Sequence, residues 1–308
     1  NDGYFDSLGI TTIWVSPLVK NPETAYGLYP NPKTTFSAYH GYWPISFTEL
    51  NPHFGTSQDL KNMVTMVHQK NMNILLDFVA HHVHENHPYY KEHPEWTTDL
   101  YLPDGTLNTE RWDEYRLTTW FDVFLPTLDL ENPEVTDMLS DSALFWIEEY
   151  DLDGFRHDAT KHIPEIFWRE LTKKLKTNVI IPENKSIYQI GETYGTPELI
   201  SSYVNTGQLN AQFDFNVYDA LSTALGTARS MSDVATIINT SLEYYGSHHL
   251  MGNITGNQDR GRFISYASGS LSFSEDAKLA GWTRDITVKD SVGYKKCAIL
   301  NAVISTLP

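Results

Sequence analysis

The sequence predicts an α/β fold built on a parallel β-sheet, and three observations lead to this prediction. Short runs rich in apolar and β-branched residues alternate along the chain with segments of helical periodicity, as is typical of parallel sheets. Several of these runs end at an acidic residue, which is where barrel enzymes carry their catalytic groups. The chain has 308 residues, a length within the range of one α/β barrel.

Six strands are expected from their apolar and β-branched content. They lie at residues 10–15, 73–78, 152–156, 187–191, 212–215 and 250–255. One helix should begin at Thr56 or Ser57, either of which can cap it. Another should begin at Asn132-Pro133-Glu134, where proline occupies the first helical position. Strand and helix therefore alternate along most of the chain, apart from one long interruption.

The interruption is the segment 80–128, which has many His, Pro, Trp and Tyr residues and little helical periodicity. So long a connection without regular structure is uncommon in a compact domain. We therefore predict a small irregular subdomain at residues 80–128, inserted into a catalytic domain made of residues 1–79 and 129–308.

The charge balance limits the kinds of partner. Lys and Arg total 22 against 39 Asp and Glu, which gives a formal net charge of −17. A chain this acidic does not suit nucleic acid or an anionic membrane, and a neutral substrate fits it better. No apolar run approaches the length of a transmembrane helix. The lone Cys297 cannot form a disulfide within the chain.

Four acidic residues stand at the ends of four predicted strands: Asp77, Asp158, Glu192 and Asp259. A single acid is usually a helix cap or a turn residue, and Arg156 with Asp158 alone could be a structural ion pair. Arg156 points to the same strand face as Asp158, where its guanidinium favours an ionised carboxylate. In a parallel sheet all four carboxylates would gather at one mouth, so one should have a raised pKa and act as an acid. An ionised carboxylate beside a protonated one is the equipment of glycoside hydrolysis.

These segments resemble, in order, the four short motifs of the α-amylase family of retaining glycoside hydrolases. The motifs are Asp77-Phe78-Val79-Ala80-His81-His82, residues 154–162 (Gly154 to His162), Gly191-Glu192-Thr193 and Gly256-Asn257-Gln258-Asp259. The segments Ala38-Tyr39-His40-Gly41-Tyr42-Trp43 and Phe54-Gly55-Thr56 are also typical of amylases. The resemblance implies a (β/α)8 TIM-type barrel with its small irregular subdomain inserted after the third strand. Because only six strands can be counted, we expect the barrel to be incomplete here, without its first and last strands, and the fragment itself to be inactive.

Carried over motif by motif, the resemblance implies three catalytic residues. Asp158 would be the nucleophile that forms a glycosyl-enzyme intermediate. Glu192 would be the general acid and then the general base. Asp259 would bind sugar hydroxyls and stabilise the oxocarbenium-like transition state. Asp77 is expected to be a buried organiser of the site, paired with Arg156, and not a chemical participant.

The resemblance also implies six substrate-binding residues: Tyr42, His82, Arg156, Lys161, His162 and Gln258. Tyr42 would be the platform on which a sugar ring stacks, although a core aromatic is the alternative for such a residue, and neighbouring Trp43 fits that alternative better. Lys161 and His162 would line the leaving-group side, with a solvated loop pair as the alternative. Gln258 departs from the family, which usually has histidine there. An amide can still bind sugar hydroxyls but cannot become charged.

A second departure concerns the calcium ion that the family holds between barrel and subdomain. His81 stands where the family has an asparagine ligand, and Thr127 aligns with an acidic ligand. Calcium takes oxygen ligands, so we expect this site to be lost and no cofactor to be required. A His81–Thr127 contact or local packing would then fasten the subdomain. The histidines at positions 81, 82, 84 and 87 leave a transition-metal site as an alternative.

The leading functional hypothesis is hydrolysis of α-1,4-glucosidic bonds in starch or maltodextrins by a retaining double displacement. A cyclodextrin-opening or transglycosylating relative would use the same three acids and stays open. A catalytically silent sugar-binding relative is the alternative from another class. The expected partner is an α-glucan oligo- or polysaccharide, with no nucleic acid and no membrane, and the expected location is extracellular or periplasmic.

Overall fold

The computed structural model describes residues 3–30, 33–227, 230–246, 249–288 and 291–307. The chain forms two compact units. The first comprises residues 1–28, 34–192 and 205–210, and the second comprises residues 29–33, 193–204 and 211–308. The boundaries of the predicted subdomain, 80–128, lie inside the first unit, so that its independence remains a prediction.

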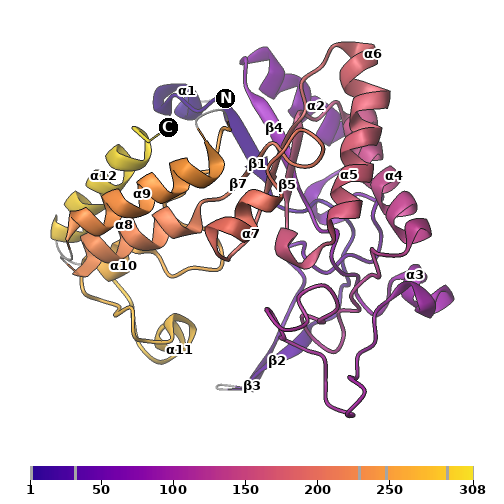
Figure 1. The fold of residues 1–308 in the computed structure, drawn as a ribbon, viewed down its shortest axis with the longest axis horizontal. Coiled ribbons are helices and arrows are strands. Elements are labelled where there is room, and N and C mark those ends of the chain that lie inside the picture. Colours follow the sequence, from indigo (N-terminus) through magenta and orange to yellow (C-terminus); the bar gives the residue numbers. More distant parts are fainter. Residues whose placement is uncertain (1–2, 31–32, 228–229, 247–248, 289–290, 308) are drawn as a thin grey trace. The chain divides into compact units, whose positions relative to one another are not determined.

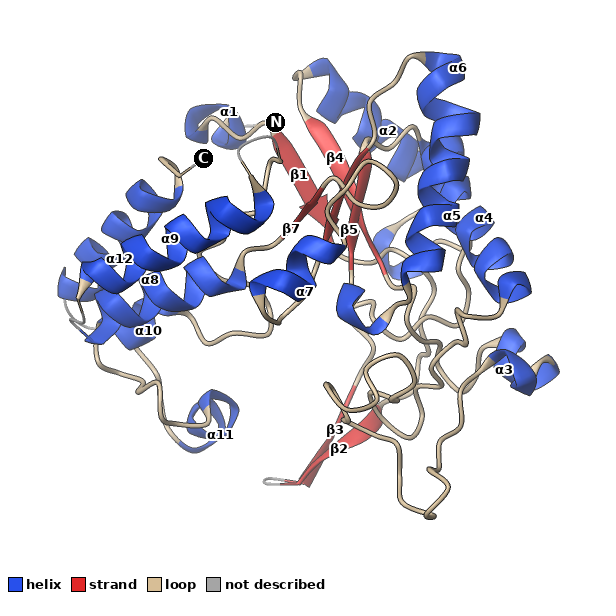
Figure 2. Cartoon of the chain, viewed as in Figure 1, coloured by secondary structure: helices blue, strands red, loops and turns tan. Residues whose placement is uncertain are grey.

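Strands and helices alternate through the first unit, and helices dominate the second (Figures 1 and 2). The strands are β1 (Thr12–Val15), β2 (Tyr26–Pro30), β3 (Lys33–Phe36), β4 (Asn73–Phe78), β5 (Gly154–His157), β6 (Tyr188–Gly191) and β7 (Ala211–Gln212). The α-helices are α1 (Tyr4–Leu8), α2 (Ser57–Gln69), α3 (Pro88–Glu92), α4 (Pro133–Tyr150), α5 (Glu165–Leu175), α6 (Ile181–Glu183), α7 (Pro197–Ser202), α8 (Phe215–Thr227), α9 (Met231–Tyr245), α10 (Phe263–Ala267), α11 (Ala277–Thr283) and α12 (Ser291–Ile304). Shorter turns are the 3-10 helices η1 (Pro52–Phe54), η2 (Pro94–Trp96) and η3 (Thr160–His162) and the π-helical turn η4 (Lys176–Ile180).

The first unit is built on parallel strands in the order β1-β4-β5-β6, which confirms the predicted α/β class. In this register Asp77 on β4 lies opposite Arg156 on β5. Side chains at paired positions point to the same face of a sheet. The register therefore sends a carboxylate and a guanidinium to one face, near the carboxyl ends of two neighbouring strands.

Local sequence signals explain where the helices flanking this sheet begin. Thr56 caps α2, and its backbone N–H in turn donates to the side chain of Asp59, which completes a capping box. The Asn132 side chain accepts from Glu134 N at the start of α4, with Pro133 in the first turn. Both helix starts were predicted from the sequence, and both are confirmed.

Gly154 allows β5 to approach β6 closely. Its φ is +149°, and a Cβ at this position would lie 1.8 Å from the carbonyl oxygen of Tyr188. No other residue can avoid that clash without moving a strand. This glycine therefore fixes the start of the strand that carries Arg156.

Two predicted strands differ from the structure. The fifth is only Ala211–Gln212, because Phe215 already begins α8. The sixth, at 250–255, is not a strand among the described residues and forms a single bridge, in which Gly252 pairs with Phe213. A two-residue neighbour offers too short an edge for a longer ladder, and this explains the difference.

The second unit has a helical core of its own. The side chains of Val217, Leu221, Val234, Phe263 and Leu300 pack together from α8, α9, α10 and α12. Within the described ranges, no helix combines the length and apolar character that crossing a membrane requires.

Candidate active site

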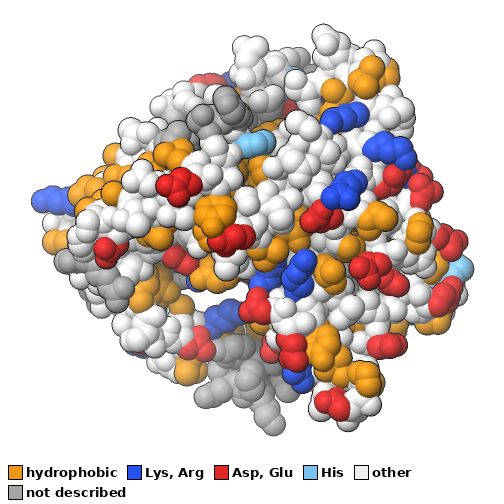
Figure 3. Space-filling view, in the orientation of Figure 1, with side chains coloured by type: hydrophobic (Ala, Val, Ile, Leu, Met, Phe, Trp, Pro, Cys, Tyr) orange, Lys and Arg blue, Asp and Glu red, His pale blue; other side chains and the backbone are white. Residues whose placement is uncertain are grey.

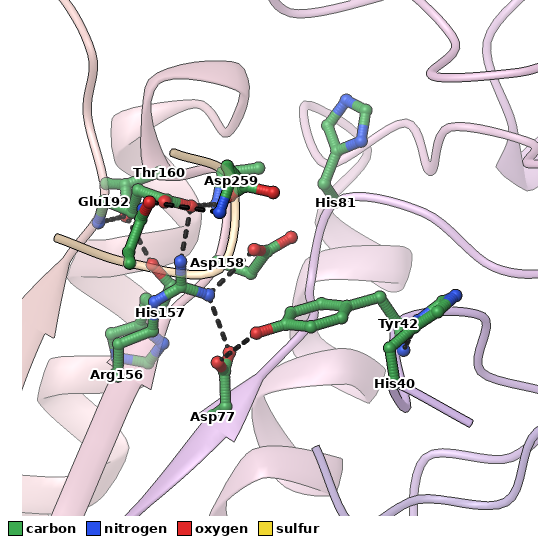
Figure 4. Close-up of polar contacts among 12 residues, drawn as sticks. His40, Tyr42, Asp77, His81, Arg156, His157, Asp158, Thr160, Glu192 and Asp259 are labelled. Carbon is green, nitrogen blue, oxygen red and sulfur yellow. Dashed lines mark hydrogen bonds and ion pairs between the residues drawn. The ribbon is translucent and has the colours of Figure 1, made fainter. Parts of the chain in front are cut away.

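Arg156 is the centre of the site in the first unit. Its side chain is fully buried and meets three carboxylates (Figure 4). Nη1 lies 2.8 Å from Asp77 Oδ1 and 2.8 Å from Asp158 Oδ1, and Nη2 lies 2.6 Å from Glu192 Oε2. Burial opposes the charge on this guanidinium, but attraction to Asp77, Glu192 and Asp158 outweighs it and raises the pKa of Arg156. One cation thus brings together three of the four acids that the sequence singled out.

Asp77 is the buried anchor of this group. Besides Arg156, it accepts hydrogen bonds from Tyr42 Oη at 2.6 Å and from Trp14 Nε1 at 3.0 Å. Burial raises the pKa of Asp77, while Arg156 and the hydrogen bonds counteract this. The Trp14 ring also lies 4.9 Å from the Arg156 guanidinium, in a cation–π contact. Trp14 was not among the predicted site residues, because its only signal in the sequence is a place in the first strand.

Asp158 and Glu192 are held by the backbones of adjacent strand ends. Asp158 N donates to Phe78 O at the end of β4. Glu192 N donates to His157 O and to Thr160 Oγ1, and Thr160 N donates back to Glu192 O. Because backbone groups fix both residues, neither carboxylate depends on a flexible loop for its position.

Tyr42 is fixed at both ends. Its hydroxyl donates to Asp77, and its backbone carbonyl accepts from His82 Nε2 at 2.9 Å. Burial and the Asp77 carboxylate raise the pKa of Tyr42, which keeps the hydroxyl a donor. Trp43 packs in a hydrophobic cluster with Ala38 and Phe124, the core role expected for it, and Tyr42 packs against the same cluster.

The histidine contacts define one tautomer for His82. Nε2 of His82 donates to a carbonyl, so its Nδ1 accepts from His81 Nδ1, 3.2 Å away. Burial lowers the pKa of His82 to about 4, which is consistent with a neutral ring. His82 thus supports Tyr42 without carrying charge.

Lys161 and His162 are buried, so the solvated-pair alternative is wrong. Lys161 Nζ forms an ion pair with Asp113 at 3.0 Å. His162 Nδ1 donates to the carbonyl of Arg116 at 2.8 Å, and burial lowers the pKa of His162 to about 4. Both partners belong to the segment 80–128.

Gln258 and Asp259 lie in the second unit, so their part in the site remains a prediction. Asp259 N donates to Asn257 Oδ1 at 3.1 Å. The next residue, Arg260, lies over the Tyr194 ring at 4.6 Å and pairs with Asp219 at 3.7 Å. Tyr194 Oη donates to the same Asp219 at 2.7 Å. The loop of Asp259 is therefore tied to α8 within its own unit.

The positions expected for calcium have other contacts. The His81 ring stacks on Phe121 at 4.2 Å, and burial lowers the pKa of His81 well below its usual range. Thr127 Oγ1 donates to Thr119 O, and the neighbouring Leu128 N donates to His81 O, while a direct contact between His81 and Thr127 stays a prediction. The four clustered histidines do not assemble: within the described parts of the chain no three His, Cys, Asp or Glu residues are placed to hold a metal.

Comparison with known proteins decides the family. The model of the α-amylase catalytic domain matches residues 3–283. The chain belongs to the α-amylase family.

Several α-amylases are similar to the chain over most of its length. α-Amylase 2 of Schwanniomyces occidentalis is 28% identical over an alignment of 280 positions, gaps included, that covers 87% of this chain and 51% of the relative. α-Amylase of Streptomyces lividans is 24% identical over an alignment of 334 positions, gaps included, that covers 90% of this chain and 36% of the relative. The chain thus spans about a third to a half of the curated relatives that it matches.

Solved α-amylase structures share the fold. The α-amylase of Geobacillus thermoleovorans, complexed with acarbose, superposes with a TM-score of 0.71 at 32% identity, covering 86% of this chain and 55% of that one. An Anoxybacillus α-amylase gives 0.70 at 30% identity and covers 86% and 54%. Catalytic domains of this family are (β/α)8 barrels, and the parallel strands of the first unit fit that class.

Proposed function

We propose that the protein containing this chain hydrolyses α-1,4-glucosidic bonds of starch or maltodextrins with retention of configuration. The observation that carries the proposal is that Asp158 and Glu192 each contact a terminal nitrogen of the one Arg156 guanidinium. Two carboxyl groups tied in this way lie close together. This supports the roughly 5–5.5 Å separation of retaining enzymes over the roughly 6.5–9.5 Å separation of inverting ones.

In the first step the Asp158 carboxylate attacks the anomeric carbon while the glycosidic C–O bond breaks. Glu192 transfers its proton to the departing oxygen, which leaves a covalent glycosyl-enzyme. In the second step Glu192 removes a proton from water, and the resulting hydroxide displaces Asp158. Asp259 would stabilise the positive charge that develops on the sugar in both transition states.

The remaining residues would hold the substrate. Tyr42 offers a ring fixed at its hydroxyl and at its carbonyl, as a stacking platform for a sugar requires. Lys161 and His162 would contact the leaving-group side, and Gln258 would bind hydroxyls at the cleaved bond. On the visible face Lys and Arg side chains are interspersed with Asp and Glu (Figure 3). Such a mixed surface suits a neutral glucan.

Product analysis tests the proposal. The protein that contains this chain is incubated with starch, cyclodextrin and maltotriose, and the anomeric form of the new ends is followed by NMR. Newly formed α-anomers from starch support a retaining α-glucan hydrolase, and β-anomers contradict it. Products longer than the substrate would favour the transglycosylating alternative. Binding without turnover, unchanged in an Asp158→Asn variant, would favour the silent sugar-binding alternative.

A further inference from the structure

Arg116 and His162 tie the segment 80–128 to the loop that follows Asp158. Arg116 Nη1 donates to the backbone carbonyl of Lys161 at 2.6 Å, and His162 Nδ1 donates to the backbone carbonyl of Arg116 at 2.8 Å. The side chain of Arg116 thus bonds to the backbone beside His162, and the side chain of His162 bonds to the backbone of Arg116. Such reciprocal bonding fixes two backbones against each other more firmly than either bond alone.

Aromatic rings pack against the His162 side chain, which makes one of these two bonds. The rings of Phe121 and Trp112 meet the His162 ring edge to face, at 5.1 and 5.7 Å. The Phe121 ring also stacks on the His81 ring. These rings fix the position of the His162 ring, which is itself buried.

The same place is poorly built for a divalent cation. Calcium takes six to eight oxygen ligands, but His81 presents a nitrogen ring committed to His82 and Phe121. The Thr127 hydroxyl is committed to Thr119. By the family resemblance the backbone carbonyl of His162 would be a further calcium ligand. The preceding carbonyl, that of Lys161, already accepts from the Arg116 guanidinium, whose positive charge would repel calcium.

We propose that Arg116 is a positioning residue that does here what the family's calcium ion does. Its guanidinium fastens the segment 80–128 to Lys161 and His162, and no divalent cation is needed for this attachment. Through Lys161 and His162 it also sets the leaving-group side of the substrate site. The effect on the substrate site rests on the proposed function, whereas the attachment of the segment 80–128 does not.

The first experiment measures the melting temperature of the protein after chelation with EDTA, alone and with added CaCl2. The proposal expects both values to agree within about 1 °C, because ligand-linked stabilisation requires a site that binds the ion. A melting temperature that rises by many degrees with calcium would overturn the proposal, whether or not the protein is active.

The second experiment compares Arg116→Gln with Arg111→Gln. Arg111 lies in the same segment, and its side chain bonds to nearby Glu114 and Thr106 of that segment, so it is the matched control. Arg116→Gln should lower the melting temperature by roughly 3–10 °C and speed chymotryptic cleavage around Tyr115 several-fold. Arg116→Lys, which keeps the charge and one donor, should recover part of the loss. Equal effects of the two glutamine variants would overturn the fastening role.

A kinetic measurement separates positioning from bulk stability. With maltooligosaccharides well below the melting temperature, Arg116→Gln should raise KM several-fold while kcat changes little, and Arg116→Lys should restore KM. An unchanged KM in a variant that melts lower would overturn the positioning role. If the wild-type protein shows no activity, the proposed function fails, while the melting and proteolysis results still decide the fastening.

Discussion

Asp77 and Arg156 lie opposite each other on the neighbouring parallel strands β4 and β5, and their side chains meet at 2.8 Å with both fully buried. This pair is the part of the site that the sheet itself builds. The same guanidinium then reaches Asp158 and Glu192. The strand register therefore determines where the two proposed catalytic carboxylates can lie.

Asp77→Asn should destabilise the protein strongly. The oxygens of Asp77 accept from Arg156, Tyr42 and Trp14. The amide of asparagine would turn N–H groups toward these donors. It would also remove one of the negative charges that balance the buried charge of Arg156. Breaking a buried ion pair costs roughly 3–5 kcal/mol, which urea unfolding can measure. Tyr42→Phe, which removes one donor to the same carboxylate, should cost roughly 1.5–3 kcal/mol. Equal losses in the two variants would show that the ion pair contributes nothing beyond one hydrogen bond.

Glu192→Gln should remove general-acid catalysis while substrate binding remains nearly intact. The rate on maltooligosaccharides should fall by roughly 10²–10⁴-fold. Substrates with activated leaving groups need no proton, so their loss in the first step should be much smaller. The measurement is a comparison of kcat/KM on the two substrate kinds. A loss of the same size on both would assign Glu192 another role.

The sequence predicts those features that depend on local signals or on strand order. The helix starts at Thr56 and Asn132 follow from capping residues, and the pairing of Asp77 with Arg156 was expected from the family resemblance. Trp14 could not be predicted, because its bond to Asp77 joins positions 63 apart and no local signal or motif in the sequence marks it. Arg116 could not be predicted either, because its partner is a backbone carbonyl 45 positions away, which no residue pattern encodes.

Gln258→His should be tolerated, because it restores the residue that the family usually has. A histidine can become charged and an amide cannot, so contacts to sugar hydroxyls at the cleaved bond should change. If the native glutamine tunes specificity, the ratio of kcat/KM on cyclodextrin to that on starch should move by roughly 3–10-fold, the value of one hydrogen bond. An unchanged ratio, with both rates unchanged, would show that the glutamine is functionally neutral.

Acidification should destabilise the protein through its buried histidines. Burial lowers the pKa of His87 to about 4 and that of His157 to about 3. Burial, with repulsion from Lys91 and His82, lowers that of His84 to about 4. The unfolded chain protonates these rings near pH 6.5, whereas the folded protein does so only near their lowered pKa values. Stability is therefore full above about pH 6.5 and falls as the pH drops toward 4, by roughly 3 kcal/mol for His87 alone.

The slope of the unfolding free energy against pH separates the protonation of His87 from the loss of packing that any substitution of its ring causes. His87→Asn keeps an acceptor for Tyr89 N, the bond that caps α3, but removes the buried ring. Between pH 6 and 4.5 the slope of the unfolding free energy should decrease by about 1.4 kcal/mol per pH unit, the contribution of one proton. His53→Asn, at an exposed histidine that pairs with Glu23, reports what loss of a surface ring does. If His87→Asn shifts the unfolding free energy equally at every pH in this window, the ring is not protonated on unfolding and the burial argument fails.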